Sequence, residues 1–306
     1  MMQSVLEVKG VNKKIAGNTI VSDISFSIEK GEVFGLIGPN GSGKTTLIRM
    51  ICGLMKVDQG EIIILGENIH SSYKEAISKV GAIIENPQFY DGLTGYQNLK
   101  LFANMYKDIS DSRIHSIVDL VGLTERIHDQ VHTYSLGMKQ RLGIAQAVLH
   151  QPKILILDEP TNGLDPAGMH DLRNHIRYLV KEENISVLIS THILSEVENL
   201  CDRIGIIKNG RIIDIQSLHD QEFSGMLEIE VDCRERAVQL LSEKYKVQQN
   251  ERQQIVLSTN KSAIPEINIL LVENGIKVFH LAFEKNQLEH SFLQAIAEEE
   301  EDVCLD

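Results

Sequence analysis

Residues 6–32 alternate between apolar and polar positions, with Val21, Ile24, Phe26 and Ile28 on the apolar side. Successive side chains of a strand point to opposite faces, so this alternation has a direct structural meaning. It predicts short antiparallel strands that bury one face and expose the other.

Three later stretches, residues 33–37, 154–157 and 187–190, are continuously apolar instead of alternating. Such runs are typical of parallel strands that are buried on both faces of a sheet. We therefore expect the three stretches to be neighbouring parallel strands in one α/β core.

Residues 96–150 change to a helical period. Two apolar faces recur at a spacing of three to four residues, namely Leu99, Phe102, Ala103 and Tyr106, then Ile114, Ile117, Val118 and Val121. This spacing predicts a helical insert over about residues 96–150. Further on, Asn209 and Gly210 separate residues 203–207 from 211–215, which favours a type I′ hairpin between two strands.

The pattern after residue 226 predicts a second, smaller domain. Its segments read as strand, helix, strand, strand, helix, strand, over residues 227–231, 237–241, 245–247, 255–257, 267–272 and 277–281. This order is that of a split βαβ sandwich. We predict a domain of residues 1–220 and a small α+β extension of residues 221–306. The extension carries no catalytic constellation, so we expect it to act in packing or dimer stabilisation, with a regulatory or ligand-sensing role as the alternative.

The overall charge narrows the choice of partners. Lys and Arg number 30 and Asp and Glu 43, a net charge of −13, which repels nucleic acid and anionic lipid. Part of the acidic excess lies in residues 298–302, interpreted as a solvated end. The four cysteines, Cys52, Cys201, Cys233 and Cys304, show no paired spacing, which fits a reducing cytoplasm. The sequence shows no signal peptide and no apolar run of about 20 residues, so any membrane crossing requires another chain.

A phosphate-loop pattern follows the strand of residues 33–37 and precedes a helix. It consists of Gly38, Pro39, Asn40, Gly41, Ser42, Gly43, Lys44, Thr45 and Thr46. The glycines allow backbone N–H groups to converge on a phosphate, and the helix N-terminus favours the same anion. In such loops the lysine, here Lys44, bridges the β- and γ-phosphates and the hydroxyl of Thr45 holds Mg²⁺.

Two carboxylates, Asp158 and Glu159, end the apolar strand of residues 154–157. The carboxyl ends of neighbouring parallel strands meet at one edge of a sheet, so both groups are expected beside the phosphate loop. We predict that Asp158 orients Mg²⁺ and that Glu159 is the general base that activates the attacking water. A guanine-reading Asn-Lys-x-Asp segment is absent, so the nucleotide is predicted to be ATP rather than GTP.

The stretch Tyr134, Ser135, Leu136, Gly137, Met138 precedes a helix and resembles the signature loop of ABC ATPases. Ser135 and Gly137 match the family pattern Leu-Ser-Gly-Gly-Gln, and the other three positions depart from it. The resemblance implies a head-to-tail homodimer in which this loop completes the nucleotide site of the second copy.

Further motifs support the resemblance and extend its implications. Asp165, in Asn162-Gly163-Leu164-Asp165, resembles the loop that links the two sites, and His192 resembles the switch histidine that contacts the γ-phosphate. Two further positions depart from the family. Ile15 stands where an aromatic residue commonly stacks on adenine, and Glu85 stands where most relatives have glutamine. As a carboxylate, Glu85 can approach Mg²⁺ or the catalytic water, and is predicted as a further catalytic or metal-binding residue.

Glu85 together with the Ser135–Arg141 segment resembles a narrower group, the ATP-binding subunits of bacitracin-type and lantibiotic-immunity exporters. That resemblance implies a separate transmembrane permease, a peptide antibiotic as cargo and a position on the cytoplasmic face of the membrane. It also implies that residues 89–95 dock the permease, although core packing is an alternative role for their aromatic side chains. A soluble ABC ATPase that acts on a cytosolic macromolecular machine stays open as the alternative. A catalytically silent binding module is disfavoured because Lys44, Glu159 and His192 are all retained.

Overall fold

The computed structural model describes residues 4–106, 108–197, 200–218, 224–242, 244–245, 247–249 and 254–285. Its internal contacts divide the chain into two units, Met1–Gln216 and Ser217–Asp306. The predicted boundary at residue 220, the acidic residues 298–302 and Cys304 lie outside the described residues.

The chain begins with an antiparallel sheet of order β2-β1-β4-β5. Its strands are β1 (Ser4–Ile15), β2 (Asn18–Glu29), β4 (Gln59–Ile64) and β5 (Glu67–Asn68). Leu6 pairs with Ile28 and Val8 with Phe26, and all four side chains are buried. The alternation in the sequence therefore predicted these strands and their buried face correctly.

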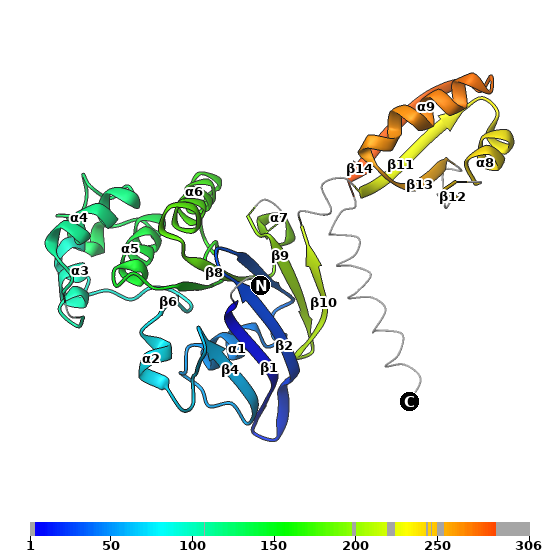
Figure 1. Ribbon diagram of the computed structural model, residues 1–306. Coiled ribbons are helices and arrows are strands. Elements are labelled where there is room, and N and C mark those ends of the chain that lie inside the picture. Colours follow the sequence, from blue (N-terminus) through cyan, green and yellow to red (C-terminus); the bar gives the residue numbers. More distant parts are fainter. Residues whose placement is uncertain are drawn as a thin grey trace. The chain divides into compact units, whose positions relative to one another are not determined.

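A six-stranded sheet of order β10-β9-β3-β8-β7-β6 forms the centre of the first unit (Figure 1). Its strands are β3 (Val33–Ile37), β6 (Val80–Ile83), β7 (Ile154–Asp158), β8 (Ser186–Thr191), β9 (Arg203–Lys208) and β10 (Arg211–Ser217). Strand β8 lies between β3 and β7 and is parallel to both, which confirms the predicted neighbours. Between β9 and β10, Asn209 and Gly210 both have positive φ, at 47° and 76°, as a type I′ turn requires.

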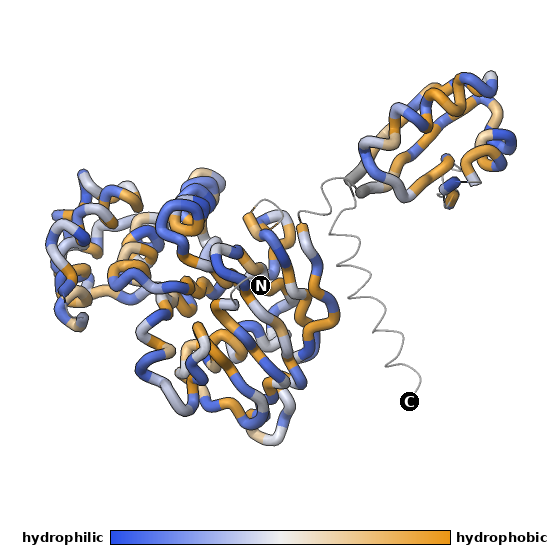
Figure 2. The backbone as a smooth tube through the Cα atoms, in the orientation of Figure 1, coloured by the Kyte–Doolittle hydropathy of each residue, from blue (hydrophilic) through white to orange (hydrophobic). Residues whose placement is uncertain are grey.

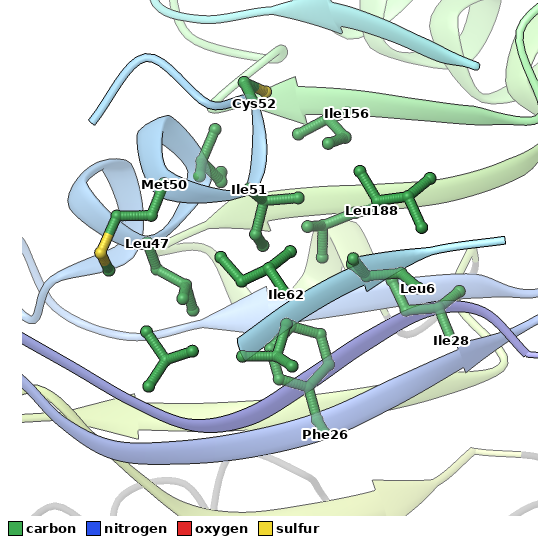
Figure 3. Packing of buried hydrophobic residues seen from close by; sticks show 14 of the residues in the cluster. Leu6, Phe26, Ile28, Leu47, Met50, Ile51, Cys52, Ile62, Ile156 and Leu188 are labelled. Atoms are coloured by element: carbon green, nitrogen blue, oxygen red, sulfur yellow. The ribbon is translucent and has the colours of Figure 1, made fainter. Parts of the chain in front are cut away.

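Helix α1 (Lys44–Ile51) lies between the two sheets. Figure 3 shows its buried side chains, among them Leu47 and Ile51, against residues from both sheets, such as Ile62 of β4 and Leu188 of β8. Each fully buried aliphatic side chain contributes about 1.5–3 kcal/mol relative to its exposed state. This packing holds the N-terminus of α1, and the loop before it, in a fixed place at the edge of the central sheet.

Helices account for most of residues 95–148, as predicted. They are α3 (Gly95–Ala103), α4 (Asp111–Leu120), the short 3-10 helix η1 (Val131–Thr133) and α5 (Leu136–Val148). Of the predicted faces, Leu99, Ala103 and the four positions from Ile114 to Val121 are buried, whereas Tyr106 remains 43% exposed.

Three further helices complete the first unit, namely α2 (Tyr73–Ile77), α6 (Pro166–Glu183) and α7 (Leu194–Val197). Helix α6 buries only Leu172, Ile176 and Leu179, and most of its length is hydrophilic in Figure 2. Within the described part of the chain, no helix is both long enough and apolar enough to span a bilayer.

The second unit has the predicted order of strands and helices. Its elements are β11 (Ser224–Val231), α8 (Arg234–Ser242), β12 (Val247–Gln249), β13 (Ile255–Asn260), the 3-10 helix η3 (Lys261–Ala263), α9 (Ile264–Glu273) and β14 (Val278–Lys285). The sheet has the order β12-β13-β11-β14 with antiparallel neighbours. Apolar side chains such as Leu227, Leu257 and Ile267 form its core. The predicted split βαβ sandwich is confirmed.

Candidate functional site

The phosphate loop connects β3 to α1 at the carboxyl edge of the central sheet. Gly41 and Gly43 have φ values of 83° and 103°, a region that favours glycine, and a Cβ on Gly43 would lie 2.8 Å from the Ile20 carbonyl oxygen. Helix α1 starts after Gly43 without a side-chain cap. Its first backbone N–H groups are therefore available to an anion in the loop.

Lys44 lies at the centre of this loop and is only 5% exposed. Its Nζ donates to the carbonyl oxygens of Gly38, at 2.7 Å, and Pro39, at 3.1 Å. The neighbouring Ser42 hydroxyl is buried and has no hydrogen-bond partner among the described residues. A buried cation beside an unpartnered donor is unfavourable by itself, and both groups fit the phosphates of a nucleotide.

Asp158 and Glu159 occupy the end of β7 beside this loop. Asp158 is 2% exposed, and its Oδ1 accepts a hydrogen bond from Ser190 Oγ at 2.5 Å. Glu159 has a φ of 49°, and its backbone N–H donates to both the carbonyl and the hydroxyl oxygen of Ser190. A non-glycine residue with this φ is strained by about 1–3 kcal/mol, which the surrounding contacts maintain.

Glu159 connects two other predicted site residues. Its Oε1 lies 3.4 Å from Lys44 Nζ, and its Oε2 accepts from His192 Nδ1 at 2.8 Å. Glu159 is 16% exposed, whereas His192 is 37% exposed. The structure thus brings Lys44, Glu159 and His192, which are far apart in the sequence, into one continuous chain of contacts.

Thr45 and Thr46, the next residues of α1, are half-buried. In the described residues, no group of three or more His, Cys, Asp and Glu side chains is arranged to hold a metal ion. Thr45 and Asp158 are the residues predicted to bind Mg²⁺, and their hydroxyl and carboxylate groups are oxygen ligands of the kind that this ion takes.

Glu85 lies outside the chain of contacts formed by Lys44, Glu159 and His192. Its φ is 62°, its side chain is 66% exposed, and its Oε1 accepts from Arg49 Nη2 at 2.5 Å. Arg49 is in the last turn of α1, at the opposite end from Lys44. The sequence analysis did not identify Arg49, because the ion pair joins residues 36 positions apart.

Ser135, Gly137 and Asp165 form a separate group. Ser135 caps α5, with Oγ accepting from the Met138 N–H at 3.3 Å, and Asp165 caps α6, with Oδ1 accepting from the Gly168 N–H at 2.8 Å. All three line a cavity of about 390 Å³ whose lining includes no residue of the phosphate loop. The predicted site residues are therefore split between two surfaces of the first unit.

Two polar residues hold the segment of residues 158–160, and the sequence analysis assigned neither a role. Ser190 contacts both carboxylate residues, as described above, and Gln140 Nε2 donates to the Pro160 carbonyl oxygen at 3.0 Å. Gln140 is 6% exposed and lies on α5. The sequence signal that could have identified Ser190 and Gln140 is a polar residue within a buried strand or on a buried helix face.

Residues 89–95 form a well-held loop before α3. The side chain of Asn98, fully buried, accepts from the Tyr90 N–H at 2.9 Å and donates to the carbonyl oxygens of Tyr90 and Thr94. The Tyr90 side chain is 65% exposed, so core packing does not explain it. Ile15, at the end of β1, is also exposed, at 41%.

Comparison with known proteins gives consistent matches. A family model described as ABC transporter matches residues 21–162. An uncharacterized ABC transporter ATP-binding protein of Bacillus subtilis, YhcH, is 46% identical over 99% of this chain and 99% of its own. The bacitracin transport ATP-binding protein BcrA of Bacillus licheniformis is 38% identical over 96% of this chain and 98% of its own. A solved structure described as an ATP binding subunit of an ABC transporter is 33% identical, with a TM-score of 0.64, over 71% of this chain and 92% of that one.

Proposed function

This chain belongs to the ATP-binding proteins of ABC transporters, and on that premise we propose that it powers export of a peptide antibiotic through a separate membrane subunit. As a member of this family it is an ATPase. The single observation that carries the catalytic part is the chain of contacts Lys44–Glu159–His192 beside the phosphate loop.

The geometry supports a role for each residue of that chain. In the structure the Lys44 ammonium group contacts Glu159 Oε1 at 3.4 Å. A triphosphate in the loop gives Lys44 new partners and leaves Glu159 free to accept a proton from the attacking water. The water oxygen then bonds to the γ-phosphorus, and the bond from that phosphorus to the β–γ bridging oxygen breaks to leave ADP. His192, which donates to Glu159 Oε2, orients the carboxylate. By its resemblance to the switch histidine, it is proposed to contact the γ-phosphate.

The Thr45 hydroxyl and, through water, Asp158 would hold Mg²⁺, which would neutralise the charge that develops on the phosphates. Ser190 supports this assignment, since its hydrogen bond at 2.5 Å holds the Asp158 carboxylate in one orientation. Glu85 remains a proposed further contact of Mg²⁺ when the nucleotide is bound. For that contact its carboxylate has to leave Arg49.

The signature residues support a head-to-tail homodimer. Ser135 and Gly137 lie at the N-terminus of the 13-residue helix α5 and line a cavity separate from Lys44. A second copy, turned around, can present this helix end to the phosphates held by the first copy. Asp165, at the start of α6, borders the same surface and links the two sites in this arrangement.

The proposed partner and cargo are supported by the names of similar proteins and by one exposed loop. Similar proteins are named as bacitracin and lantibiotic transport ATP-binding proteins. Residues 89–95 present Tyr90 to solvent from a backbone held by Asn98, which suits a rigid docking site for a membrane subunit on the cytoplasmic face. Ile15, without an aromatic ring to stack on adenine, is proposed to weaken contact with the base.

Affinity isolation from solubilised membranes tests the proposal. We expect a tagged full-length chain to recover a polytopic membrane protein, and bacitracin to raise the ATPase activity of that complex over activity without peptide. The Lys44→Ala chain controls for activity from contaminating ATPases. Recovery of ribosomes or of another cytosolic assembly in place of a membrane protein would establish the alternative of a soluble ABC ATPase.

A further inference from the structure

Glu196, on α7, accepts two hydrogen bonds that join the segments on either side of the proposed active site. Its Oε2 accepts from Thr161 Oγ1 at 2.6 Å and from Thr191 Oγ1 at 2.8 Å. Thr161 follows Glu159 by two residues, and Thr191 immediately precedes His192. One carboxylate oxygen therefore connects the chain beyond the proposed base to the chain before the histidine.

Thr191 extends this connection to the phosphate loop. It is fully buried, its carbonyl oxygen accepts from the Gly38 N–H at 3.3 Å, and its hydroxyl accepts from the Ile193 N–H at 3.1 Å. The end of β8 is thus held to the phosphate loop by its backbone and to Glu196 by its side chain.

The second oxygen of this carboxylate is in an unusual state. Glu196 Oε1 is buried and has no hydrogen-bond partner among the described residues. Glu196 lines a cavity of about 90 Å³ whose other side chains are largely apolar, including Leu172, Ile176 and Ile189. Burying an unpartnered polar atom costs about 1–3 kcal/mol, so packing alone does not favour a glutamate here. The same apolar surroundings strengthen the two hydroxyl–carboxylate bonds.

From these contacts we propose that Glu196 is a positioning residue for ATP hydrolysis, which holds the Glu159 and His192 segments at a fixed separation through Thr161 and Thr191. The inference rests on the proposed roles of Glu159 and His192. Glu159 leaves β7 with a φ of 49°, and His192 lies beyond the last residue of β8, so the position of each side chain depends on the segment that follows its strand. The 2.8 Å contact between His192 Nδ1 and Glu159 Oε2 therefore depends on the two segments that Glu196 connects.

The test compares Glu196→Ala with Glu196→Gln in the full-length chain, assembled with its membrane partner for turnover. The alanine removes the acceptor, and since misplacement by about 1 Å can reduce turnover about 100-fold, we expect kcat to fall by about 10- to 100-fold. The nucleotide contacts of Lys44 and the glycine loop remain, so KM and the dissociation constant for ATP stay unchanged. Glutamine keeps a carbonyl oxygen that accepts both hydroxyls, so Glu196→Gln restores most of kcat.

Thr161→Val removes one of the two donors with little change in shape and provides a second measurement if Glu196→Ala does not fold. We expect a lower kcat from this variant, and less than additive loss when it is combined with Glu196→Ala. Thr124→Val is the matched control, because Thr124 Oγ1 donates to Asp119 at 2.6 Å in the helical insert, away from the site.

Four results overturn the inference. They are a normal kcat in Glu196→Ala, an unchanged kcat in Thr161→Val, a loss of ATP affinity that parallels the loss of kcat, and a Gln variant as inactive as the Ala variant despite an unchanged melting temperature. Glu159→Gln, measured in parallel, separates the proposed role of Glu159 as base from the proposed positioning role of Glu196. If Glu159→Gln retains turnover, the proposed base is wrong, whereas an inactive Glu159→Gln with a normal Glu196→Ala removes only the positioning role.

Discussion

The two units of this chain bury different kinds of side chains. Within the described residues, all buried polar or charged side chains belong to the first unit, and they include Lys44, Asp158, Ser190 and Thr191. The core of the second unit is formed by aliphatic side chains such as Leu227, Leu257 and Leu271. Burying a charged or polar group is unfavourable unless it is paired, so the first unit carries a cost that the second does not.

The location of the buried polar groups shows why the first unit carries this cost of burial. Lys44, Asp158, Ser190 and Thr191 gather where β3, β7 and β8 end, at the carboxyl edge of the central sheet. Ligands bind in α/β proteins at this edge, because loops and helix N-termini converge there. The second unit folds by apolar burial and shows no comparable cluster within its described residues. The contrast predicts that substitutions at this edge of the first unit alter chemistry, and that those in the core of the second unit alter stability.

The largest expected effect is that of Glu159→Gln. Removal of the proposed base should reduce kcat by about 10²- to 10⁴-fold, while ATP binding persists because Lys44 and the glycine loop are intact. Turnover and nucleotide binding are measured on the complex with the membrane partner. Glu266→Gln, on the exposed surface of α9, serves as the control and should leave kcat unchanged. Near wild-type hydrolysis in Glu159→Gln would contradict the assignment.

Leu257→Ala should have the next largest effect, and on stability only. Leu257 is fully buried in the second unit, and truncation of such a leucine typically costs about 2–5 kcal/mol. Hydrogen exchange should show lost protection in residues 224–285 and none in residues 4–216, with kcat unaffected. Val272→Ala, at a position 57% exposed, is the matched control. A fall in kcat with Leu257→Ala would show that the two units are coupled.

Glu85→Gln compares two carboxylates of the first unit, because the Glu85 side chain is exposed and that of Glu159 is not. An exposed ion pair contributes about 0.2–1 kcal/mol, so basal hydrolysis should change by less than about fivefold. Transport should fall further, because the proposed docking loop follows Glu85 directly. Both rates are measured in one reconstituted complex, with Arg49→Gln as the variant that breaks the same pair. Equal losses of hydrolysis and transport would refute a coupling role.

The smallest effect concerns pH and His150, at the junction of the helical insert and β6. Burial lowers the pKa of His150 from its usual 6.5, and Nε2 donates to the Val80 carbonyl oxygen while Nδ1 is buried without a partner among the described residues. Well above pH 6.5 the imidazole is largely neutral in both the folded and the unfolded state. As the pH falls below 6.5, the unfolded chain binds a proton first, so the stability of the first unit should decrease.

Urea unfolding of the wild type and of His150→Gln, followed between pH 7.5 and about pH 5, measures this effect. Glutamine can still donate to Val80 but does not titrate, so the variant should lose part of the pH dependence. An identical pH dependence in both proteins would assign the effect to other groups.

Much of the fold could be predicted because its strands and turns depend on residue patterns over a few neighbouring positions. The continuous apolar runs became β3, β7 and β8, and Asn209-Gly210 became a hairpin with two positive φ values. The phosphate-loop residues carry their own signal, since glycine at Gly41 and Gly43 is what a loop with positive φ requires. Their assignment as a nucleotide site, like that of Glu159 and His192, stays a prediction.

Other features depend on contacts between distant segments and left no local signal. The glutamate at position 196 reads as an ordinary acidic residue on a short helix, yet it joins Thr161 to Thr191. Glu85 was interpreted as a metal or catalytic group, and the structure pairs it with Arg49. Neither partner could be inferred from spacing, because each contact is created by the packing of separate elements.

The sequence by itself determined which elements form and in what order, since side-chain period and turn chemistry act over a few residues. Tertiary structure alone decided which groups meet. The pairing of Asp158 with Ser190 across β7 and β8 brings Glu159 to His192, 33 positions away. The physical reason is that a parallel sheet aligns the ends of strands that are far apart in the chain, and only that alignment places a carboxylate, a cation and a histidine together at one edge of the sheet.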